Sequence, residues 1–238
     1  MGGSIALKQT DDHINVAIDG PAGAGKSTVA KLVAERLGYI YIDTGAMYRV
    51  VAYKALASGI SPDDTAEAVR TAESIRIELR PGMQRQQVWA DGKDVTDVIR
   101  SASVTSNVSA FAANPGVREI LARKQQEMAR KKGVVMDGRD IGTHVLPDAE
   151  VKVYLTATVE KRAERRFNEL PDGTMSMEEL REDIARRDDM DRNREHSPLV
   201  QAEDAIRIDS TYMTIEEVTE SILDICSNVM NQGVEQNE

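Results

Sequence analysis

The chain contains 238 residues with a net charge of −10, and 41% of them are hydrophobic, which is enough for one large domain or for a core with small inserted domains. The acidic balance makes duplex DNA or RNA a poor partner, because affinity for nucleic acid comes largely from Lys and Arg. No apolar run approaches the ~20 residues that span a bilayer, and the N-terminal stretch MGGSIALKQTDDH is too polar for a secretory signal. We therefore expect no nucleic-acid partner and no membrane segment.

Five short apolar runs predict β-strands, and amphipathic helical segments separate them. The runs are Ile14–Asp19, Tyr39–Asp43, Val134–Asp137, Val151–Leu155 and Ala205–Asp209. Nearly continuous apolar strands are typical of a parallel sheet that is covered on both faces. The order predicts an α/β fold, a doubly wound five-stranded parallel sheet. Four of the runs end on Asp at the carboxyl edge, where open sheets bind ligands.

Capping residues and glycines mark the ends of the helices. Lys26–Leu37 is expected to stop at Gly38, and Thr44 is expected to cap a helix that runs to Ser58. Further signals are Asn114 before Pro115, Gly133 after the same helix, and the capping-box pairs Ser176 with Glu179 and Thr214 with Glu217.

The stretch Ser74–Val95 alternates with period two and contains the turn signals Pro81–Gly82 and Asp91–Gly92. It predicts a small antiparallel insertion. The insertion is either a decorative hairpin or part of a mobile substrate-binding domain, and its place between two substrate-facing motifs favours the second interpretation.

The segment GPAGAGKST follows a predicted strand, opens a predicted helix, and satisfies the phosphate-loop pattern G-x-x-x-x-G-K-[ST]. Its glycines let backbone N–H groups turn inward around phosphate oxygens, and the helix N-terminus adds partial positive charge. The residues expected to bind ATP are Gly20, Pro21, Ala22, Gly23, Ala24, Gly25, Lys26, Ser27 and Thr28.

Within this loop, Lys26 is expected to reach the β- and γ-phosphates, and the Ser27 hydroxyl is expected to ligate Mg²⁺ directly. Asp137 ends an apolar strand in the manner of a Walker B carboxylate. We expect it in the outer shell of the metal, with capping of the next turn as its alternative role. The chain has no N-K-x-D guanine-reading pattern, which disfavours a GTPase.

Two more motifs lie at the carboxyl ends of predicted strands. DTGAMYR begins at Asp43 and places Arg49 one to two turns into a helix, within reach of a phosphate. VVMDGRDIGT places Arg139 and Asp140 on a loop. On an arbitrary surface such a pair is only solvated charge, but beside a phosphate loop ligand binding is the better interpretation.

A third charged motif, RRDDMDRNR, runs from Arg186 to Arg194 and ends the helix that begins after Ser176. A mixed-charge helix end is ordinarily a solvated face. Phosphoryl transfer changes that interpretation, because arginines on a closing lid stabilise the spreading negative charge and exclude water.

Residues suited to a general base are scarce. His13, His144 and His196 stand in no suitable motif. A phosphate-monoester acceptor needs no base, because its second pKa is near ~6 and it is already anionic. An alcohol acceptor would usually need a carboxylate, and Asp43 or Asp137 could serve, so both kinds of acceptor stay open here.

Taken together, six segments resemble bacterial cytidylate kinases. They are GPAGAGKST, DTGAMYR, the P-G-V-R of Pro115–Arg118, DGRDIGT, RRDDMDRNR and the IDST of Ile208–Thr211, in matching order from about Ile14 to about Val229. The resemblance implies a nucleoside-monophosphate-kinase fold with a CMP-binding insertion and a short arginine-bearing lid. It implies transfer of the γ-phosphoryl group of MgATP to CMP and dCMP, in pyrimidine metabolism.

The resemblance also assigns residues. Arg49 and Arg139 would clamp the acceptor phosphate, and Arg194 would approach the phosphates as the lid closes. Thr44 stands where the family often has serine. The implied CMP-binding set is Thr44, Arg49, Ser109, Arg118, Arg139, Asp140, Arg187 and Asp191, with Arg187 and Asp191 on the sugar, and the catalytic set is Lys26, Arg139, Arg187 and Arg194.

The resemblance further implies that Ser109, Arg118 and Asp140 read the base, and hydrogen-bonding chemistry supports this for Arg118 and Asp140. A carboxylate such as Asp140 accepts from the cytosine N4 amino group, and a guanidinium such as Arg118 donates to N3 or O2. Uracil would place its O4 acceptor against the carboxylate, so UMP is expected to be a much poorer acceptor.

The expected organisation is an N-terminal tail at 1–13, a kinase core at 14–230 and a C-terminal tail at 231–238. The core includes the CMP-binding insertion at 60–110 and the lid region at 158–195. The single cysteine, Cys226, excludes an internal disulfide bond and fits a reducing compartment. We expect Cys226 to lie in the core, and the protein to be a cytoplasmic monomer.

Three alternatives stand beside this interpretation. Another small P-loop kinase would act on a different nucleotide or on a small alcohol such as shikimate. A regulatory module would bind ATP without turnover. A nucleic-acid-binding ATPase is disfavoured by the acidic balance and by the 4% aromatic content, because single-strand binders use aromatic stacking.

Overall fold

The computed structural model describes residues 13–82, 85–169 and 175–235. Most of the predicted tail at 1–13, and positions 236–238 of the predicted tail at 231–238, lie outside the described residues. Among the helices of the described ranges, none is both long enough and apolar enough to cross a membrane.

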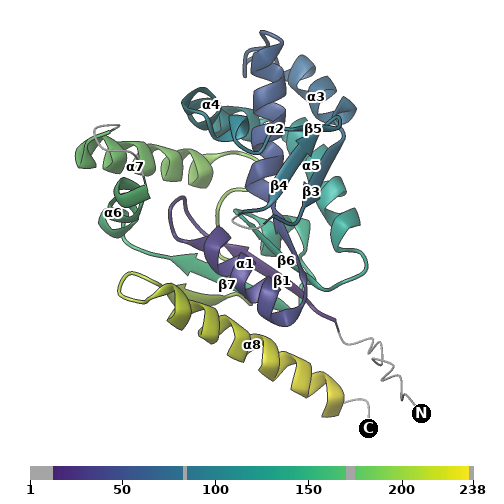
Figure 1. Cartoon of the computed structure of the whole chain (residues 1–238), viewed down its shortest axis with the longest axis vertical. Helices are drawn as coiled ribbons and strands as arrows, with labels where there is room; N and C mark the ends of the chain where they lie inside the picture. Colours follow the sequence, from purple (N-terminus) through teal and green to yellow (C-terminus); the bar gives the residue numbers. More distant parts are fainter. Residues whose placement is uncertain (1–12, 83–84, 170–174, 236–238) are drawn as a thin grey trace.

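Five parallel strands form the central sheet, in the order β2-β6-β1-β7-β8 (Figure 1). This confirms the predicted doubly wound α/β fold, and each predicted strand end is within one residue of the observed end. The strands are β1 (Asn15–Asp19), β2 (Ile40–Asp43), β6 (Val134–Gly138), β7 (Val151–Thr156) and β8 (Ile206–Asp209).

Helices cover both faces of this sheet, and the middle residues of β1 and β6 are accordingly apolar and buried. On one face, α1 (Lys26–Leu37) and α8 (Ile215–Glu235) share a buried core with β1, β7 and β8 (Figure 1). Cys226 lies in this core, as expected. On the other face, α5 (Pro115–Ala129) and a π-helical turn (Ile141–Val145) pack against β6.

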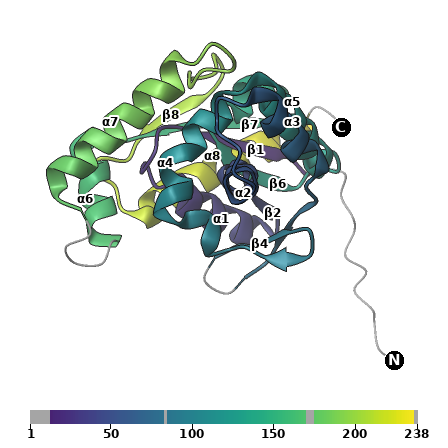
Figure 2. The same ribbon diagram turned by 90° about the horizontal axis from the view of Figure 1, so that it is seen from above.

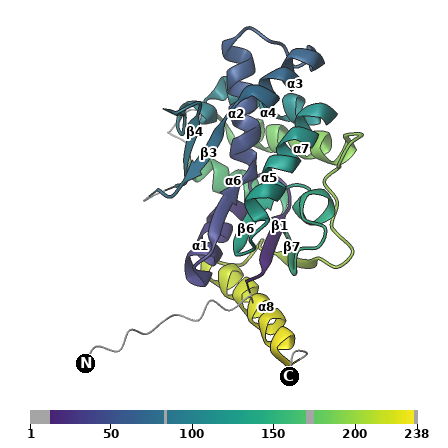
Figure 3. The ribbon, with the colours of Figure 1, turned by 90° about the vertical axis from the view of Figure 1, so that its right-hand side faces the viewer.

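A second hydrophobic core lies beyond the carboxyl edge of the sheet. It joins helix α2 to the insertion and to α5, and in Figure 3 it forms the end of the molecule opposite α8. The predicted antiparallel stretch is a three-stranded sheet in the order β3-β4-β5. The strands of this sheet are β3 (Ile77–Arg80), β4 (Gln87–Ala90) and β5 (Lys93–Asp94). The helices that share the core with it are α2 (Thr44–Ala57), α3 (Thr65–Ser74) and α4 (Ala102–Ala113), besides α5.

Two helices, α6 (Val159–Glu169) and α7 (Met177–Asn193), pack against each other through a small apolar cluster. They project to one side of the molecule, with α4 between them and α2 in the view from above (Figure 2). The Ser176 capping box at the start of α7 is present, and the charged motif at its end is helical up to Asn193, as predicted.

The expected cap of α2 is wrong by one residue. Asp43 is the N-cap, and its Oδ1 accepts a hydrogen bond from the Ala46 N–H at 2.8 Å. Thr44 is already helical, and its hydroxyl donates to the Asp137 carbonyl at 2.6 Å. The reason is that β2 runs through Asp43, so this residue has the extended backbone that a capping position requires.

Asn114 connects helix α3 of the insertion to helix α5 of the core. Its Oδ1 accepts from the N–H groups of Gly116 and Val117 at the start of α5, and its Nδ2 donates to the Thr65 carbonyl at the start of α3. We expect Asn114→Ala to lower the free energy of unfolding by about 1–2 kcal/mol, because the cap is lost at a buried position.

Asn114→Ser is the matched variant, because serine keeps a capping oxygen and lacks the amide donor to Thr65. Chemical denaturation of both variants tests the account. Equal losses for Ala and Ser would contradict the capping role.

Candidate active site

A cleft of about 870 Å³ opens at the carboxyl edge of the sheet. Its walls are the phosphate loop, the start of α2, helix α4 of the insertion, the loop after β6, and helices α6 and α7. The cleft brings together every residue predicted to bind a nucleotide or metal, with the exception of Gly20 and Pro21. These residues come from sequence segments as far apart as Ala22 and Arg194.

The phosphate loop leaves β1 at Gly20, where the backbone passes against β7. Gly20 has a φ of +151°, and a Cβ there would lie 1.9 Å from the Leu155 carbonyl oxygen. No other residue fits this path without moving β7. The loop ends at Gly25, which has a φ of 90° and precedes the first residue of α1. The N-terminus of α1 therefore faces the cleft, with its free N–H groups available to an anion.

Lys26 is the first residue of α1 and is only 6% exposed. Its Nζ donates to the Pro21 carbonyl at 2.8 Å. Burial, together with the nearby Arg139, lowers the pKa of Lys26 to about 7. A polyphosphate in the loop would offset this loss of solvation, because opposite charge favours the protonated amine.

Oxygen atoms converge beside the loop. Asp137, at the end of β6, accepts a hydrogen bond from the Ser27 hydroxyl at 2.8 Å and another from the Tyr41 hydroxyl at 2.9 Å. Burial and the nearby Asp43 carboxylate raise the pKa of Asp137 to about 6. Among the described residues, no group of three or more His, Cys, Asp or Glu side chains could hold a metal by itself. A hydroxyl and a carboxylate are hard oxygen donors of the kind that suit Mg²⁺ shared with phosphate oxygens.

At the far end of the cleft, Arg118 and Asp140 form an ion pair whose side chains are both 4% exposed. Arg118 Nη2 donates to Asp140 Oδ2, and its Nη1 donates to the Ala112 carbonyl at 3.1 Å. The guanidinium also lies 5.3 Å from the centre of the Tyr48 ring. Ser109, on α4, lines the same end of the cleft. The pair joins α5 to the loop after β6 and leaves Arg118 Nε without a hydrogen-bond partner among the described residues.

Between the phosphate loop and this pair lies a group of arginines. Arg139 Nε donates to Asp191 Oδ2 at 2.8 Å, and Arg49 Nη1 donates to the Thr105 hydroxyl at 2.8 Å. Arg194 lies 3.6 Å from Asp140 Oδ1, and Arg187 lines the cleft from α7.

The guanidinium groups of this cluster are desolvated and crowd one another. Burial and the nearby Arg187 lower the pKa of Arg49 to about 10. The pKa of Arg187 is lowered by burial and by Arg139, and that of Arg194 by burial and by Arg118. In the described part of the chain, Arg187 Nε and Arg194 Nη2 are buried without a hydrogen-bond partner. Buried donors of this kind favour an anionic ligand.

Sequence reasoning missed several residues of the cleft region, and two of them are charged groups with partners in the site. Arg100 lines the cleft, and its Nη2 lies 3.1 Å from Asp43 Oδ2. Asp19 ends β1, and its two carboxylate oxygens accept from the N–H groups of Ile141 and Gly142 at 2.8 and 2.7 Å. The apolar run that ends at Asp19 indicated this residue in the sequence, whereas no motif indicated Arg100.

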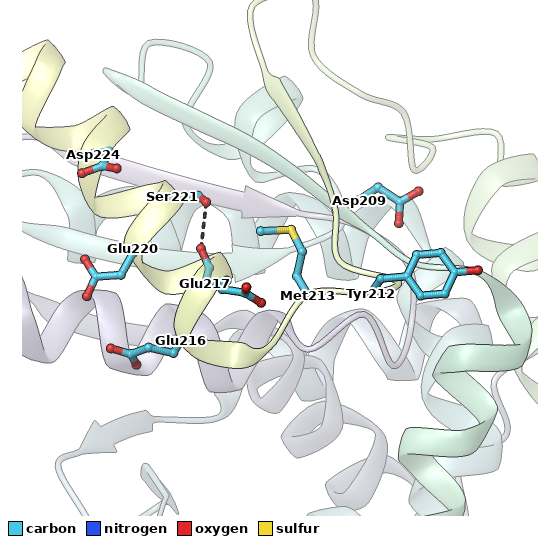
Figure 4. A pocket seen from close by; sticks show the side chains of 8 residues that line it. All are labelled: Asp209, Tyr212, Met213, Glu216, Glu217, Glu220, Ser221 and Asp224. Carbon is cyan, nitrogen blue, oxygen red and sulfur yellow. Dashed lines mark hydrogen bonds between the residues drawn. The ribbon is translucent and has the colours of Figure 1, made fainter.

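A second hollow, between β8 and the first turns of α8, is lined by acidic groups. Figure 4 shows Asp209, Glu216, Glu217, Glu220 and Asp224 around it, together with Tyr212, Met213 and Ser221. Arg36 pairs with Glu216 and Glu220 at its rim. This hollow repels phosphate, so the arginine-lined cleft is the candidate site for an anionic substrate.

The fold and the cleft define a P-loop phosphotransferase, with a phosphate loop at one end and a separate cation-lined site at the other. The comparisons with known proteins identify the family. The model of the cytidylate kinase family matches residues 16–228, so the chain belongs to that family. The resemblance noted in the sequence is thereby confirmed.

Individual relatives agree with this membership. The cytidylate kinase of Bacillus cytotoxicus is 51% identical over 224 residues, which cover 93% of this chain and 100% of the relative. The cytidylate kinase of Bacillus cereus is 52% identical over 221 residues, covering 92% and 98%. The crystal structure of an uncharacterized protein from Eubacterium ventriosum matches with a TM-score of 0.50 at 12% identity, over 91% of this chain and 99% of that one, and shows the fold alone.

The buried Asp19 gives a prediction about pH. Burial raises the pKa of Asp19 from 3.8 to about 6, against the hydrogen bonds from Gly142 and Ile141. Between these two values the folded protein binds the proton more tightly than the unfolded chain, so this contribution to stability is present at low pH and is lost as pH rises. Relative to Asp19→Asn, the wild type should lose at most about 3 kcal/mol between pH 4 and 6.5.

Denaturant titrations of both proteins across this range measure the difference. Glu150→Gln is the control, because Glu150 also accepts a backbone N–H, from Asn15, but lies at the opposite edge of the sheet and has a lowered pKa. If the stability of the wild type relative to Asp19→Asn stays constant or increases with pH, the assignment to Asp19 is contradicted.

Proposed function

We propose that this protein transfers the γ-phosphoryl group of MgATP to CMP, and also to dCMP, giving ADP and CDP or dCDP. The observation that carries the proposal is the cleft itself. It joins a phosphate loop to a buried Arg118–Asp140 pair through a row of desolvated arginines. Family membership supports CMP as the acceptor.

In this proposal the phosphate loop and Lys26 hold the phosphates of ATP. Ser27 would ligate Mg²⁺ and Asp137 would bind its outer shell, since both offer hard oxygen donors 2.8 Å apart at the start of α1. The bound metal would neutralise charge on the β- and γ-phosphates. The Ser27 hydroxyl can ligate the metal through a lone pair while it still donates its proton to Asp137, which also keeps its hydrogen bond from Tyr41.

Asp140 and Arg118 are proposed to read the cytosine, with Ser109 beside them. Asp140 Oδ2 accepts from Arg118, and Oδ1 has only the Arg194 guanidinium 3.6 Å away, so Oδ1 is the oxygen that we propose accepts from the N4 amino group. Arg118 Nε is buried and unpartnered in the described structure, so it is the atom best placed to donate to the base. The same geometry disfavours uracil, whose O4 would meet a carboxylate oxygen.

Arg49 and Arg139 are proposed to clamp the acceptor phosphate, and Arg187 and Asp191 to bind the sugar. Asp191 holds Arg139 by a 2.8 Å hydrogen bond, which keeps the guanidinium in the cleft before the acceptor arrives. Thr44 is the least direct member of the set, because its hydroxyl proton is already donated to the Asp137 carbonyl.

In the transfer step, an oxygen of the acceptor phosphate forms a bond to the γ-phosphorus as the bond between that phosphorus and the β–γ bridging oxygen breaks. No proton transfer is required, because the acceptor phosphate is already ionised. Lys26, Arg139, Arg187 and Arg194 stabilise the charge that spreads over the transferred oxygens. Helices α6 and α7, in the region 158–195, would exclude water when they close.

The wider organisation belongs to the same proposal. The segment 60–110 is taken as the CMP-binding insertion of the core at 14–230, because its helix α4 lines the cleft. A cytoplasmic location fits the free, buried thiol of Cys226, and we propose that the protein acts as a monomer.

An acceptor panel tests the function. With MgATP, we expect release of ADP on addition of CMP or dCMP, and at least a hundredfold lower kcat/KM with UMP, on the order of what unpaired buried polar groups cost. AMP, GMP and shikimate serve as further acceptors in the same assay. Turnover with one of these in place of CMP would overturn the assignment of the pocket, and ATP binding without any turnover would indicate a regulatory module.

The variant Asp140→Asn tests the base assignment directly. An amide can turn its Nδ2 toward the uracil O4, so the variant should have a higher KM for CMP and a smaller preference for CMP over UMP, by about tenfold or more. Glu150→Gln, with the same chemical change at the distant edge of the sheet, should keep the preference of the wild type. An unchanged CMP-to-UMP ratio in Asp140→Asn would remove Asp140 from the base site.

A further inference from the structure

One fully buried cation has no part in the chemistry described so far. Arg162, in the first turn of α6, is 2% exposed and is the largest of the fully buried side chains in the described part of the chain. Burying a guanidinium is costly unless all of its hydrogen bonds are made. Its contacts therefore indicate why the position holds an arginine.

Arg162 donates to three different segments. Its Nε donates to the Ala157 carbonyl at 2.9 Å, just after β7, and its Nη1 donates to the Ala22 carbonyl at 2.9 Å, within the phosphate loop. Its Nη2 lies 2.7 Å from Asp188 Oδ2, on α7. One rigid guanidinium thus joins the sheet, the phosphate loop and the helix that carries the acceptor residues.

The contact with Ala22 orients the phosphate loop. The C=O and N–H of a trans peptide point in opposite directions, and no cis peptide is present in the described chain. Because the Ala22 carbonyl points to Arg162, the N–H of Gly23 points away from α6, and Gly23 lines the cleft. The loop lies directly on α6, since a Cβ on Gly23 would be 3.2 Å from the Arg162 Cβ.

The next turn of α6 repeats this contact. Arg165 Nη1 donates to the Ala24 carbonyl at 3.4 Å, and its Nη2 donates to the Ser210 carbonyl at 2.6 Å. Helix α6 therefore places two guanidinium groups against carbonyls of the phosphate loop. Of these two arginines, Arg162 is the one that also pairs with α7, through Asp188.

On the other side, Asp188 is adjacent to Arg187 and lies three residues before Asp191. It is 3% exposed, and its Oδ1 has no hydrogen-bond partner among the described residues. Arg162 is accordingly the group that holds this carboxylate. Fixing Asp188 fixes the rotation of α7, and with it the direction in which Arg187 and Asp191 face the cleft.

We propose that Arg162 is a positioning residue that sets the phosphate loop and helix α7 relative to each other, so that the donor phosphates and the acceptor site are aligned. The proposal concerns the alignment of two nucleotides and therefore rests on the proposed function. Arg162 itself touches neither nucleotide, because it is buried beneath the loop.

Two variants separate the two ends of this connection. Asp188→Asn keeps the shape of the side chain but removes the charge on the α7 side. Arg162→Lys keeps a buried cation but replaces three directed donors by one short ammonium group. The constants to measure are the Kd of ATP without an acceptor, by titration, the KM of CMP, kcat, and the melting temperature.

We expect Asp188→Asn to raise the KM of CMP about tenfold while the Kd of ATP stays within about twofold of the wild type. Arg162→Lys should weaken both by about tenfold, and the double variant should be no worse than Arg162→Lys alone. Glu150→Gln is the control, because it removes a carboxylate charge at the amino edge of the sheet, and its nucleotide constants should be unchanged.

A loss of melting temperature in both variants, with unchanged nucleotide constants, would overturn the proposal and leave Arg162 a purely structural residue. If Arg162→Lys does not fold, Asp188→Asn decides by its KM for CMP, where a selective rise supports the proposal and no change overturns it. Failure of the proposed function would be seen differently, as a wild type that forms no CDP. In that case a weakened Kd of ATP in Arg162→Lys still supports the loop half of the proposal, and an unchanged Kd overturns it.

Discussion

The parallel pairing of β1 with β6 determines where the chemistry of this protein can occur. Asp19, the last residue of β1, is paired in register with Gly138, the last residue of β6. The phosphate loop leaves one strand and the Arg139–Asp140 loop leaves the other, at neighbouring points of the same sheet edge. Asp19 then binds the turn after Asp140 through two backbone N–H groups, so the two loops are joined at their bases as well as by the sheet.

Acidic and basic side chains gather in different parts of this molecule. The chain as a whole carries a net charge of −10, and carboxylates line the hollow beside α8 (Figure 4). The cleft, in contrast, holds a row of arginines. Arg139 is paired with Asp191 and Arg118 with Asp140, and within the described residues Arg118 Nε, Arg187 Nε and Arg194 Nη2 are buried without a hydrogen-bond partner. Such pairs keep the cations oriented without satisfying them fully, which is the arrangement that an anionic ligand would complete.

The sequence predicted those features that depend on local chemistry. The phosphate loop, the strands that lead into it and the Arg139–Asp140 loop are written in short segments of fixed spacing, so the sheet and most of the cleft lining could be predicted. The cap of α2 could not be placed correctly, because Asp43 and Thr44 are both capping residues and only the end of β2 decides between them. The roles proposed for the individual site residues stay predictions.

The positions of Arg162 and Arg100 could not be predicted, because they depend on contacts between distant segments. Helix α6 reads VEKRAERRFNE, which looks like a solvated charged helix. Nothing in that pattern reveals that the phosphate loop covers its first turn and buries one arginine among its charged neighbours. Arg100 likewise enters the cleft because the insertion folds back on Asp43, a contact between segments that no local motif records.

The order of the strands also has a consequence for how the chain reaches this structure. Both neighbours of β1 in the sheet, β6 and β7, follow the entire insertion in the chain. During synthesis β1 therefore has no partner strand until the insertion has been made, whereas α2, α3, the small sheet, α4 and α5 share a core of neighbouring elements. Local contacts form faster than distant ones, so the acceptor half can condense first and the central sheet can close over it last. The phosphate loop is then the first motif to be synthesised and among the last to be shaped.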